Sequence, residues 1–323
     1  MGYAQVIPMP ERSIGRSGRD LFLSHKDITI VMVPYELHSI FPKAVDELYR
    51  NTQIPFNLIL VEGNAPEAVR VQLERRQRQH GNMTIIYTNH CPALANAYNL
   101  ALPHIKTRYA LFLDNEARLT KGSLESMMAA ADEFHASVIY PQDSMMPRRI
   151  HTYRAEDQIV ETVETFGLRP CFLISQDGLH GSGKLFDETS SPYTIGVDLA
   201  YKMRSRGLVM KEQKGAKIEM RLTGPVQAMD LPIFRVQWSR ERYFQSMEQI
   251  EKKWGIHIEN NAAYDSWLQG KMFQAERPVG LEVLFNHMAS SMRDNSRRVH
   301  DAVLNFRAFG WAKESYPTKI NAR

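Results

Sequence analysis

The 323-residue sequence contains few cysteines and no long apolar run. Its two cysteines, Cys91 and Cys171, are too few for a disulfide framework, which favours a reducing compartment, and we expect a cytoplasmic protein. Without a stretch of about 18 apolar residues, no transmembrane helix is expected. The first 26 residues carry three arginines but no apolar core, so they do not resemble a secretory signal.

The sequence also has little net charge. Its 40 Lys and Arg residues nearly balance 36 Asp and Glu residues, which gives a formal charge of +4. Because no concentrated basic stripe is present, no nucleic-acid partner is expected. The hydrophobic fraction of 43% and the charged fraction of 24% are those of a globular protein, which excludes global disorder, collagen and coiled coil.

Three common motifs are missing. The sequence has no Gly-x-Gly-x-x-Gly segment and no Gly-Lys-Ser/Thr phosphate loop, which counts against a dinucleotide dehydrogenase and a P-loop enzyme. It also has no Gly-x-Ser-x-Gly elbow, which counts against an α/β-hydrolase.

Short apolar runs alternate with helical patterns along the first half of the chain. This alternation predicts βαβ units, and therefore an α/β fold with a doubly wound, mainly parallel sheet and helices on both faces. The expected strands are 27–33, 56–62, 83–88, 109–114, 137–141 and 171–175, and the expected helices are 38–50, 66–79, 92–105, 121–134 and 196–207. The polar segment 142–170 is expected to be an irregular, substrate-facing loop.

These patterns divide the chain into three parts. Residues 1–26 are expected to form a flexible arm, 27–225 a sheet domain, and 226–323 a helical region. In the helical region, apolar and basic residues alternate at helical spacing over 239–254 and 279–311. We favour a helical cap on the sheet or a homodimer contact, and peripheral contact with the inner face of a membrane stays open.

Polar residues follow the expected strands where each strand ends, which is where open α/β sheets bind ligands. Asp114 and Glu116 are the sharpest case, because spacing i, i+2 in an extended chain points both carboxylates to one side. Two such ligands suit Mg²⁺ or Mn²⁺ held together with a diphosphate. The alternative is that these acids cap the next turn or contact water.

Several segments, in this order and spacing, resemble glycosyltransferase family 2, the nucleotide-sugar-dependent enzymes of the GT-A fold. The segments are LILVEGNAP (58–66), TNHCPALANAYNLAL (88–102), LFLDNEA (111–117), GSGKLFDE (181–188) and VDLAYKMRSRG (197–207). The resemblance covers roughly 27–210. It implies a GT-A-like catalytic domain over 27–225, with a helical C-terminal region after it.

The resemblance also implies a donor and a role for each matching residue. The donor would be a nucleotide sugar (UDP- or GDP-sugar), and the partner a hydroxyl acceptor such as a glycan, a lipid-linked sugar or a protein. The implied nucleotide-binding residues are Pro34, Tyr35, Glu36, Glu62, Asn96 and Asp114, although Asn96 equally suits a residue that fixes a loop. Asp114 and Glu116 would hold Mn²⁺ or Mg²⁺.

Three departures from the family pattern affect the chemistry. Glu116 stands where Asp is usual, which preserves an oxygen ligand. Ile195-Gly196 replaces the usual Glu-Asp pair and leaves Asp198 as the provisional base, with Asp187 and Glu188 as alternatives. A helix cap is an equally good interpretation of Asp198. Third, the segment KIEMRLTG (217–224) lacks the family's metal-binding histidine, and His257 lies too far on to be assigned.

Other conspicuous residues carry weaker signals. His90-Cys91 has no partner at metal spacing and suits a loop, and Arg148, Arg149 and Arg154 are candidate contacts for acceptor or diphosphate. We therefore predict an inverting, metal-dependent hexosyltransferase, with a role in polysaccharide biosynthesis. The alternative is a related binding or scaffold protein that has lost its base. A nucleotidyltransferase is disfavoured because no Gly-rich loop follows the first strand.

Overall fold

The computed structural model describes residues 5–7, 27–142, 149–153, 160–164, 171–180, 184–220, 226–258 and 262–276. The contacts divide the chain after Glu276, so that all of these residues belong to one compact unit.

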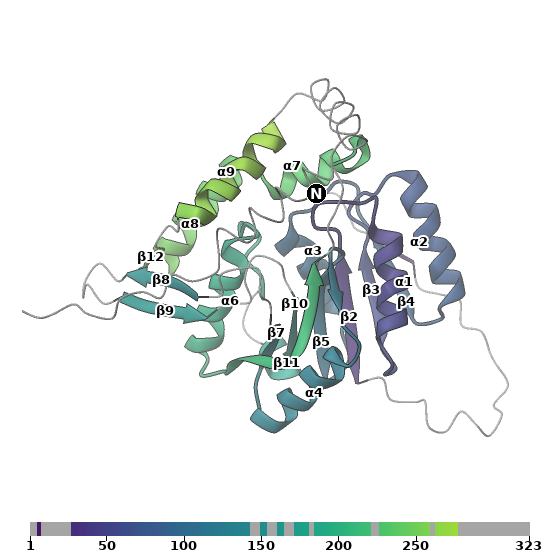
Figure 1. Ribbon diagram of the computed structural model, residues 1–323, viewed down its shortest axis with the longest axis horizontal. Coiled ribbons are helices and arrows are strands. Elements are labelled where there is room, and N and C mark those ends of the chain that lie inside the picture. The colour runs from purple at the N-terminus through teal and green to yellow at the C-terminus, as the bar shows by residue number, and fades with distance from the viewer. Residues whose placement is uncertain are drawn as a thin grey trace, which may run out of the picture. The chain divides into compact units, whose positions relative to one another are not determined.

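Nine strands of the described residues form a single mixed sheet (Figure 1). β2, β3, β4 and β5 pair in parallel, whereas β10 is antiparallel to both of its neighbours, β5 and β7. In order across the sheet, the strands are β1 (Gln5–Ile7), β4 (Met83–Tyr87), β3 (Asn57–Val61), β2 (Ile28–Val33), β5 (Tyr109–Asp114), β10 (Cys171–Ser175), β7 (Val138–Gln142), β11 (Met210–Met220) and β6 (Ala117–Leu119). The α/β fold class expected from the sequence is confirmed.

Helices cover both faces of this sheet, because successive residues of its central strands point to opposite sides. In β2, Ile30 and Met32 join one buried cluster, whereas Val31 and Val33 join another. α1, α2 and α4 contribute to the first cluster, and α3, α6, α7, α8 and α9 to the second. The helices are α1 (Phe41–Asn51), α2 (Glu67–Gln79), α3 (Leu94–Ala101), η2 (Leu102–His104), α4 (Ser123–Phe134), α5 (Gln176–Leu179), α6 (Thr194–Ser205), η3 (Ala228–Asp230), α7 (Leu231–Gln237), α8 (Arg240–Trp254) and α9 (Ala262–Glu276).

The helices α7, α8 and α9 pack on the sheet rather than on one another alone. Phe234, Trp238 and Met272 are buried in the same cluster as Val31 and Val33 of β2. α8 begins at its N-cap Ser239, whose hydroxyl accepts a hydrogen bond from Arg242 N, and it ends before Gly255 at φ +62°. The helix expected over 239–254 is therefore confirmed, and the segment 279–311 lies outside the described residues.

The segment 142–170 differs from its expectation as an irregular loop. Two described parts of it, β8 (Arg149–Tyr153) and β9 (Val160–Glu164), pair with each other, and β8 also pairs with β12 (His257–Ile258). Both sequences, RIHTY and VETVE, are rich in β-branched residues, which favours strands. Within the expected N-terminal arm, Gln5–Ile7 forms β1 and pairs with β4.

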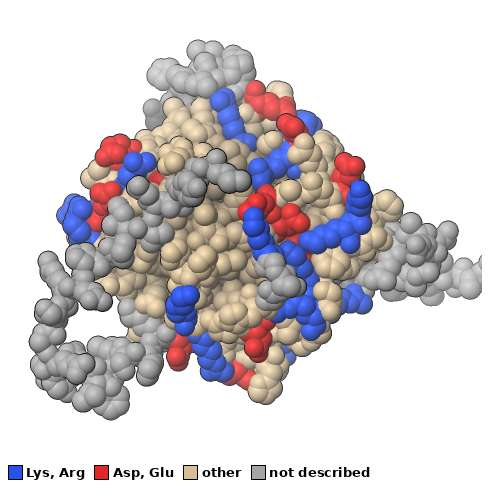
Figure 2. Space-filling model, turned by 180° about the vertical axis from the view of Figure 1, so that it is seen from behind, with Lys and Arg blue, Asp and Glu red and all other residues tan. Residues whose placement is uncertain are grey.

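Two surface properties bear on partners. No helix of the described residues is long and apolar enough to cross a membrane. On the face in Figure 2, Lys and Arg side chains lie beside Asp and Glu side chains, around a broad area without charges. Among the described residues, Arg76 and Asp46 form an ion pair at 2.6 Å.

Candidate functional site

The strand order reverses at β2 and β5, and this reversal places two chain segments side by side. β3 and β4 lie on one side of β2, and β5 lies on the other. Val33 and Asp114 are opposite each other at the carboxyl ends of these parallel strands. Residues 34–37 and the turn of Asn115 and Glu116 therefore follow these two strand ends side by side, in the crevice where open α/β sheets bind ligands.

Asn115 fastens these two segments to each other. Its Oδ1 accepts a hydrogen bond from Tyr35 N at 3.0 Å, and its Nδ2 donates one to Leu37 O at 2.6 Å. The side chain is completely buried. This role of Asn115 was not predicted from the sequence, although an amide between two acids is a usable signal, since it can both donate to and accept from backbone groups.

Asp114 and Glu116 lie in a tight turn. β5 ends at Asp114, and Asp114 Oδ1 accepts hydrogen bonds from Glu116 N and Ala117 N, both at 2.7 Å. Asn115 and Glu116 form that turn, so that the extended spacing assumed from the sequence does not apply. Glu116 Oε1 accepts from Glu36 N at 2.8 Å, and both acids of the turn are completely buried.

Glu36 brings a third carboxylate to this crevice, and a lysine from the C-terminal helices contacts it. Lys271 Nζ on α9 lies 2.6 Å from Glu36 Oε2. The Glu36 side chain is 2% exposed and the Lys271 side chain 22%. Lys271 is not predictable from the sequence, because nothing near residue 271 indicates a contact with residue 36.

Glu62 is the fourth acid, and it shapes the loop after β3. Its Oε2 accepts from Ala65 N at 2.5 Å and its Oε1 from Thr88 N at 3.0 Å. The adjacent Gly63 has φ +71°, and a Cβ there would lie 2.7 Å from Pro34 Cγ, so that this close approach requires glycine. His38 Nε2 donates to Gly63 O at 3.1 Å, and burial lowers the pKa of His38.

The oxygen chemistry of Asp114 and Glu116 suits a divalent cation. Among the described residues there is no group of three or more His, Cys, Asp or Glu side chains that could hold a metal ion. Mg²⁺ and Mn²⁺ need fewer protein ligands when a bound substrate supplies phosphate oxygens, because one or two carboxylates then suffice. The pair therefore fits a cation that arrives together with a phosphate ligand.

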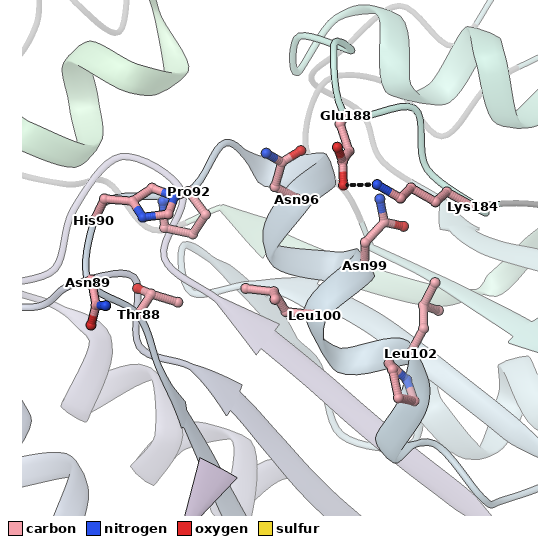
Figure 3. A pocket seen from close by; sticks show the side chains of 11 residues that line it. Thr88, Asn89, His90, Pro92, Asn96, Asn99, Leu100, Leu102, Lys184 and Glu188 are labelled. Atoms are coloured by element: carbon pink, nitrogen blue, oxygen red, sulfur yellow. Dashed lines mark hydrogen bonds and ion pairs between the residues drawn. The ribbon is translucent and has the colours of Figure 1, made fainter. Parts of the chain in front are cut away.

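Asn96 lines a pocket of about 560 Å³, together with Thr88, the residue whose N–H donates to Glu62 (Figure 3). Asn96 and Asn99 project from α3, between the segment Thr88–Pro92 and the side chains of Lys184 and Glu188. Among the described residues, neither Asn96 Oδ1 nor Thr88 Oγ1 has a hydrogen-bond partner. Two residues that line the pocket therefore each carry a buried oxygen atom without a hydrogen-bond partner.

Asn99 connects the pocket to the segment 184–188. Its Nδ2 donates to Phe186 O at 2.8 Å, and its Oδ1 accepts from Phe186 N at 3.2 Å. Lys184 Nζ and Glu188 Oε1 pair at 2.6 Å across the pocket wall. These contacts hold Glu188, one of the alternative bases, beside the pocket.

Asp198 lies in a different environment. It is in the second turn of α6, which starts at Thr194, so it does not cap this helix. Asp198 Oδ1 accepts from Lys253 Nζ at 2.7 Å and Trp254 Nε1 at 2.9 Å, and Oδ2 pairs with Lys202 Nζ at 2.7 Å. With 1% of the residue exposed, its carboxylate connects α6 to α8.

The pKa values around Asp198 follow from these contacts. Burial lowers the pKa of Lys202, and the charge of Asp198 opposes that shift. Burial also acts to lower the pKa of Lys253, but Asp198 and Asp187 outweigh it, and the pKa is raised. For Asp187, burial acts to raise the pKa, and hydrogen bonds from Thr189 and Lys253 lower it overall.

The position of the family's usual base is part of the core. Ile195 is 2% exposed, and Gly196 is also buried. The preceding Thr194 hydrogen-bonds to Ser246 of α8 through its hydroxyl. The replacement of Glu-Asp by Ile-Gly thus coincides with close packing between α6 and α8.

The remaining candidates lie outside these groups. Burial, followed by the charge of Glu62, raises the pKa of Cys91 to about 11, so that its thiol is protonated near neutral pH, unlike a metal ligand. His257 begins β12, and its Nδ1 lies 3.6 Å from Oε2 of Glu251 on α8. The His257 side chain is 65% exposed. Arg149 begins β8, and Arg148 and Arg154 lie outside the described residues.

Comparison with known proteins connects this fold to sugar transfer. Residues 29–186 match the model of the family Glycosyl transferase family 2. The mannosyltransferase PcManGT from Pyrobaculum calidifontis, in complex with GDP-Man and Mn²⁺, matches with a TM-score of 0.50 and 11% identity, over 88% of this chain and 80% of that chain. S. aureus TarS 1-349, in complex with UDP-GlcNAc, matches with a TM-score of 0.45 and 14% identity, over 66% of this chain.

The match to TarS spans 65% of that chain, slightly less than two thirds. A search of curated proteins finds no match. The family match supports a glycosyltransferase, and the mannosyltransferase, at its low identity, supports the fold. Residues 29–186 therefore match glycosyltransferase family 2, the family that the sequence resembles, and the fold is similar to that of a GT-A glycosyltransferase.

Proposed function

We propose that this protein transfers a sugar from a nucleotide diphosphate donor to a hydroxyl acceptor, with a divalent cation held by Asp114 and Glu116. The observation that carries the proposal is the cluster of buried acids at the carboxyl ends of β2 and β5. Hydrogen bonds between the segments 34–37 and 114–117 fix these acids before any ligand binds. Such preorganisation is what an electrostatic catalyst requires.

The cation would supply charge stabilisation for the departing diphosphate. Asp114 and Glu116 would hold it, and their backbone hydrogen bonds keep both side chains oriented. PcManGT was solved in complex with GDP-Man and Mn²⁺, and these two ligands support this choice of donor class and metal. UDP- and GDP-sugars are both candidate donors.

The nucleoside would lie against the loops that follow β2 and β3. We assign it to Pro34, Tyr35 and Glu36 on one side and to Glu62 on the other. Glu62 already accepts two backbone N–H groups, so its role would be to shape the base pocket as well as to contact the base. The orphaned oxygen of Asn96 supports a contact with the donor from α3.

The base that activates the acceptor has more than one candidate among the acids. A general base has to reach the acceptor hydroxyl and accept its proton. Asp198, the provisional base, is buried between two ammonium groups, which contact both of its oxygens. Glu188 is 45% exposed beside the pocket, and this access favours Glu188 as the alternative base.

A binding or scaffold protein is the second candidate function. The packing of Ile195 and Gly196 where the family has its base, together with the paired Asp198, favours it. Both functions include binding of the nucleotide sugar. They differ in the reaction that follows, since a scaffold would neither transfer nor hydrolyse the bound donor.

Thermal shift with UDP, GDP and their sugars, with and without Mn²⁺, tests the proposal. The wild type should be stabilised by one nucleotide series in the presence of Mn²⁺, and Asp114→Asn should lose this metal-dependent shift. Asparagine retains an oxygen for the N–H groups of Glu116 and Ala117, so the turn is preserved while the charge is removed. If no nucleotide stabilises the wild type, neither candidate function holds.

Location and assembly are further proposals. We place the enzyme in the cytoplasm, where a nucleotide sugar would be available, and expect polysaccharide biosynthesis as its role. A homodimer through the C-terminal helices, or contact with the inner face of a membrane, remains a prediction for α8 and the segment that follows the described residues.

A further inference from the structure

Helix α9 carries one lysine to the crevice at the end of β2. Lys271 and Glu36 are 235 residues apart in sequence, and their Nζ and Oε2 atoms are 2.6 Å apart. The glutamate side chain is 2% exposed and the lysine side chain 22%. An anion that enters the crevice from solvent would therefore meet Lys271 before it met Glu36.

Three aromatic rings surround the ammonium group of Lys271. The ring centroids of Phe234, Trp238 and Trp267 lie 5.3, 5.7 and 5.7 Å from Nζ. Trp238 also contacts the Tyr35 ring edge to face, at 5.9 Å between centroids. Aromatic faces attract a cation without adding a formal charge, so they hold Lys271 in place while its ionic partner changes.

The Lys271–Glu36 pair conflicts with the role proposed for Glu36. A carboxylate oxygen can accept more than one hydrogen bond, but a ribose hydroxyl or a base N–H that approached Glu36 Oε2 would have to compete with the lysine for it. The donor would also bring a diphosphate to the same crevice, because Glu36 N is hydrogen-bonded to Glu116, one of the two acids assigned to the cation. A lysine ammonium on its flexible stem binds phosphate as a point charge.

We propose that Lys271 is a binding residue for the diphosphate of the nucleotide donor, and that it exchanges Glu36 for a phosphate oxygen when the donor binds. This inference rests on the proposed function. Its consequence is that one movement releases Glu36 for the nucleoside and pairs Lys271 with the leaving group. The C-terminal helices would thus contribute a residue to the site of the family 2 domain.

The test compares the affinity of nucleosides with that of nucleoside diphosphates. Calorimetric titrations with uridine and UDP, and with guanosine and GDP, are made in Mn²⁺ on the wild type and on Lys271→Met. Methionine retains an unbranched apolar side chain among the rings. The measured quantity is the ratio of the nucleoside Kd to the diphosphate Kd, because a general loss of folding would not change this ratio.

We expect Lys271→Met to lower this ratio on the order of 10- to 100-fold, the effect of losing one hydrogen bond between charged groups, and Lys271→Arg to restore most of it. Glu36→Gln should weaken nucleoside binding but leave the ratio within about threefold of the wild type. Glu276→Gln is the matched control, since it removes another ion pair of α9, with Arg240 at 2.8 Å, away from the crevice.

Two results would overturn the inference without affecting the proposed function. One is an unchanged ratio in Lys271→Met, which would assign Lys271 to the docking of α9. The other is tighter diphosphate binding in this variant, which would make Lys271 an obstacle to the donor. If the wild type binds no nucleoside diphosphate at all, the proposed function itself fails, and the inference fails with it.

Discussion

Two groups of buried acids in this protein differ in what their carboxylates contact. At the ends of β2, β3 and β5, Glu62, Asp114 and Glu116 accept hydrogen bonds from backbone N–H groups. Between α6 and α8, Asp198 instead accepts from the ammonium groups of Lys202 and Lys253. All four acids are at most 1% exposed.

The difference indicates what each group is suited to. A backbone N–H orients a carboxylate without cancelling its formal charge, so the loop acids are well placed to attract a cation. Two ammonium groups neutralise Asp198, and breaking such a buried arrangement is costly because it leaves charges unpaired. The first group therefore suits ligand binding, and the second suits the attachment of one helix to another.

The largest effect should come from removing charge at the first group. We expect Glu116→Gln and Asp114→Asn each to reduce sugar transfer by about 10²- to 10³-fold, because the leaving diphosphate loses electrostatic stabilisation. Initial rates at saturating Mn²⁺ measure this loss. Urea denaturation should find little change in unfolding free energy, since the amide retains the oxygen that Glu36 N contacts. Retained transfer in both variants would assign the cation to other residues.

At the second group the effect should appear in stability. Asp198→Asn leaves Lys202 without its carboxylate partner and leaves Lys253 with only Asp187, at 3.3 Å, and we expect it to lower the unfolding free energy by about 3 kcal/mol. Urea denaturation at pH 7 measures this loss.

The activity of the folded Asp198→Asn variant then decides its chemical role. Activity within a few-fold of the wild type at low temperature, together with a large loss in Glu188→Gln, would identify Glu188 as the base. If instead Asp198→Asn keeps its stability and loses transfer, the contrast between the two groups is wrong and Asp198 is the base.

The sequence predicts the strands and the acids after them, but it does not predict the contacts between distant parts of the chain. The strands ITIVMV and YALFLD and the acids after them are local signals, because apolar runs and strand ends are visible in a few consecutive residues. The Lys271–Glu36 pair joins residues 235 positions apart, and no local pattern indicates it. The contacts of Asp198 with α8 are hidden for the same reason.

Some local signals were misleading because the backbone turns where an extended chain was assumed. Asp114 accepts the N–H groups of the next residues, so the i, i+2 spacing of the two acids reflects a turn and not strand alternation. The sequence does not predict β11 as a strand, because its polar segment MKEQKGAKIEM lacks the apolar content of a buried strand. Its pairing with β7 and β6 stabilises it as a strand regardless of its composition.

A moderate effect is expected at the loop that carries Glu188. Asn99→Ala removes two hydrogen bonds to the backbone of Phe186, and we expect a loss of about 1–2 kcal/mol of unfolding free energy. Because this loop forms one wall of the pocket, the KM for the acceptor should rise more than the KM for the donor. Equal rises in both values would argue against an acceptor site beside Glu188.

The smallest effect should be the pH dependence of Asp187. Its folded-state pKa is lowered, because hydrogen bonds from Thr189 and Lys253 outweigh burial, so its contribution to stability is present above its usual value of 3.8. That contribution should be lost as the pH falls from 3.8 through the folded-state pKa. Asp187→Asn should lower the unfolding free energy by about 0.5 kcal/mol at pH 7. The unfolding free energy of this variant should also depend less on pH in this acid range than that of the wild type. An unchanged pH profile would show that the pair with Lys253 contributes nothing.

The central claim is that the acids at the ends of β2 and β5 hold the cation and the diphosphate of a nucleotide sugar. A crystal structure with Mn²⁺ and a non-hydrolysable nucleotide sugar, with the metal located by its anomalous scattering, tests it directly. The account predicts the manganese peak at Asp114 and Glu116, with phosphate oxygens completing its coordination. A peak at the Asp187–Asp198 region, or a diphosphate bound away from both acids, would contradict it.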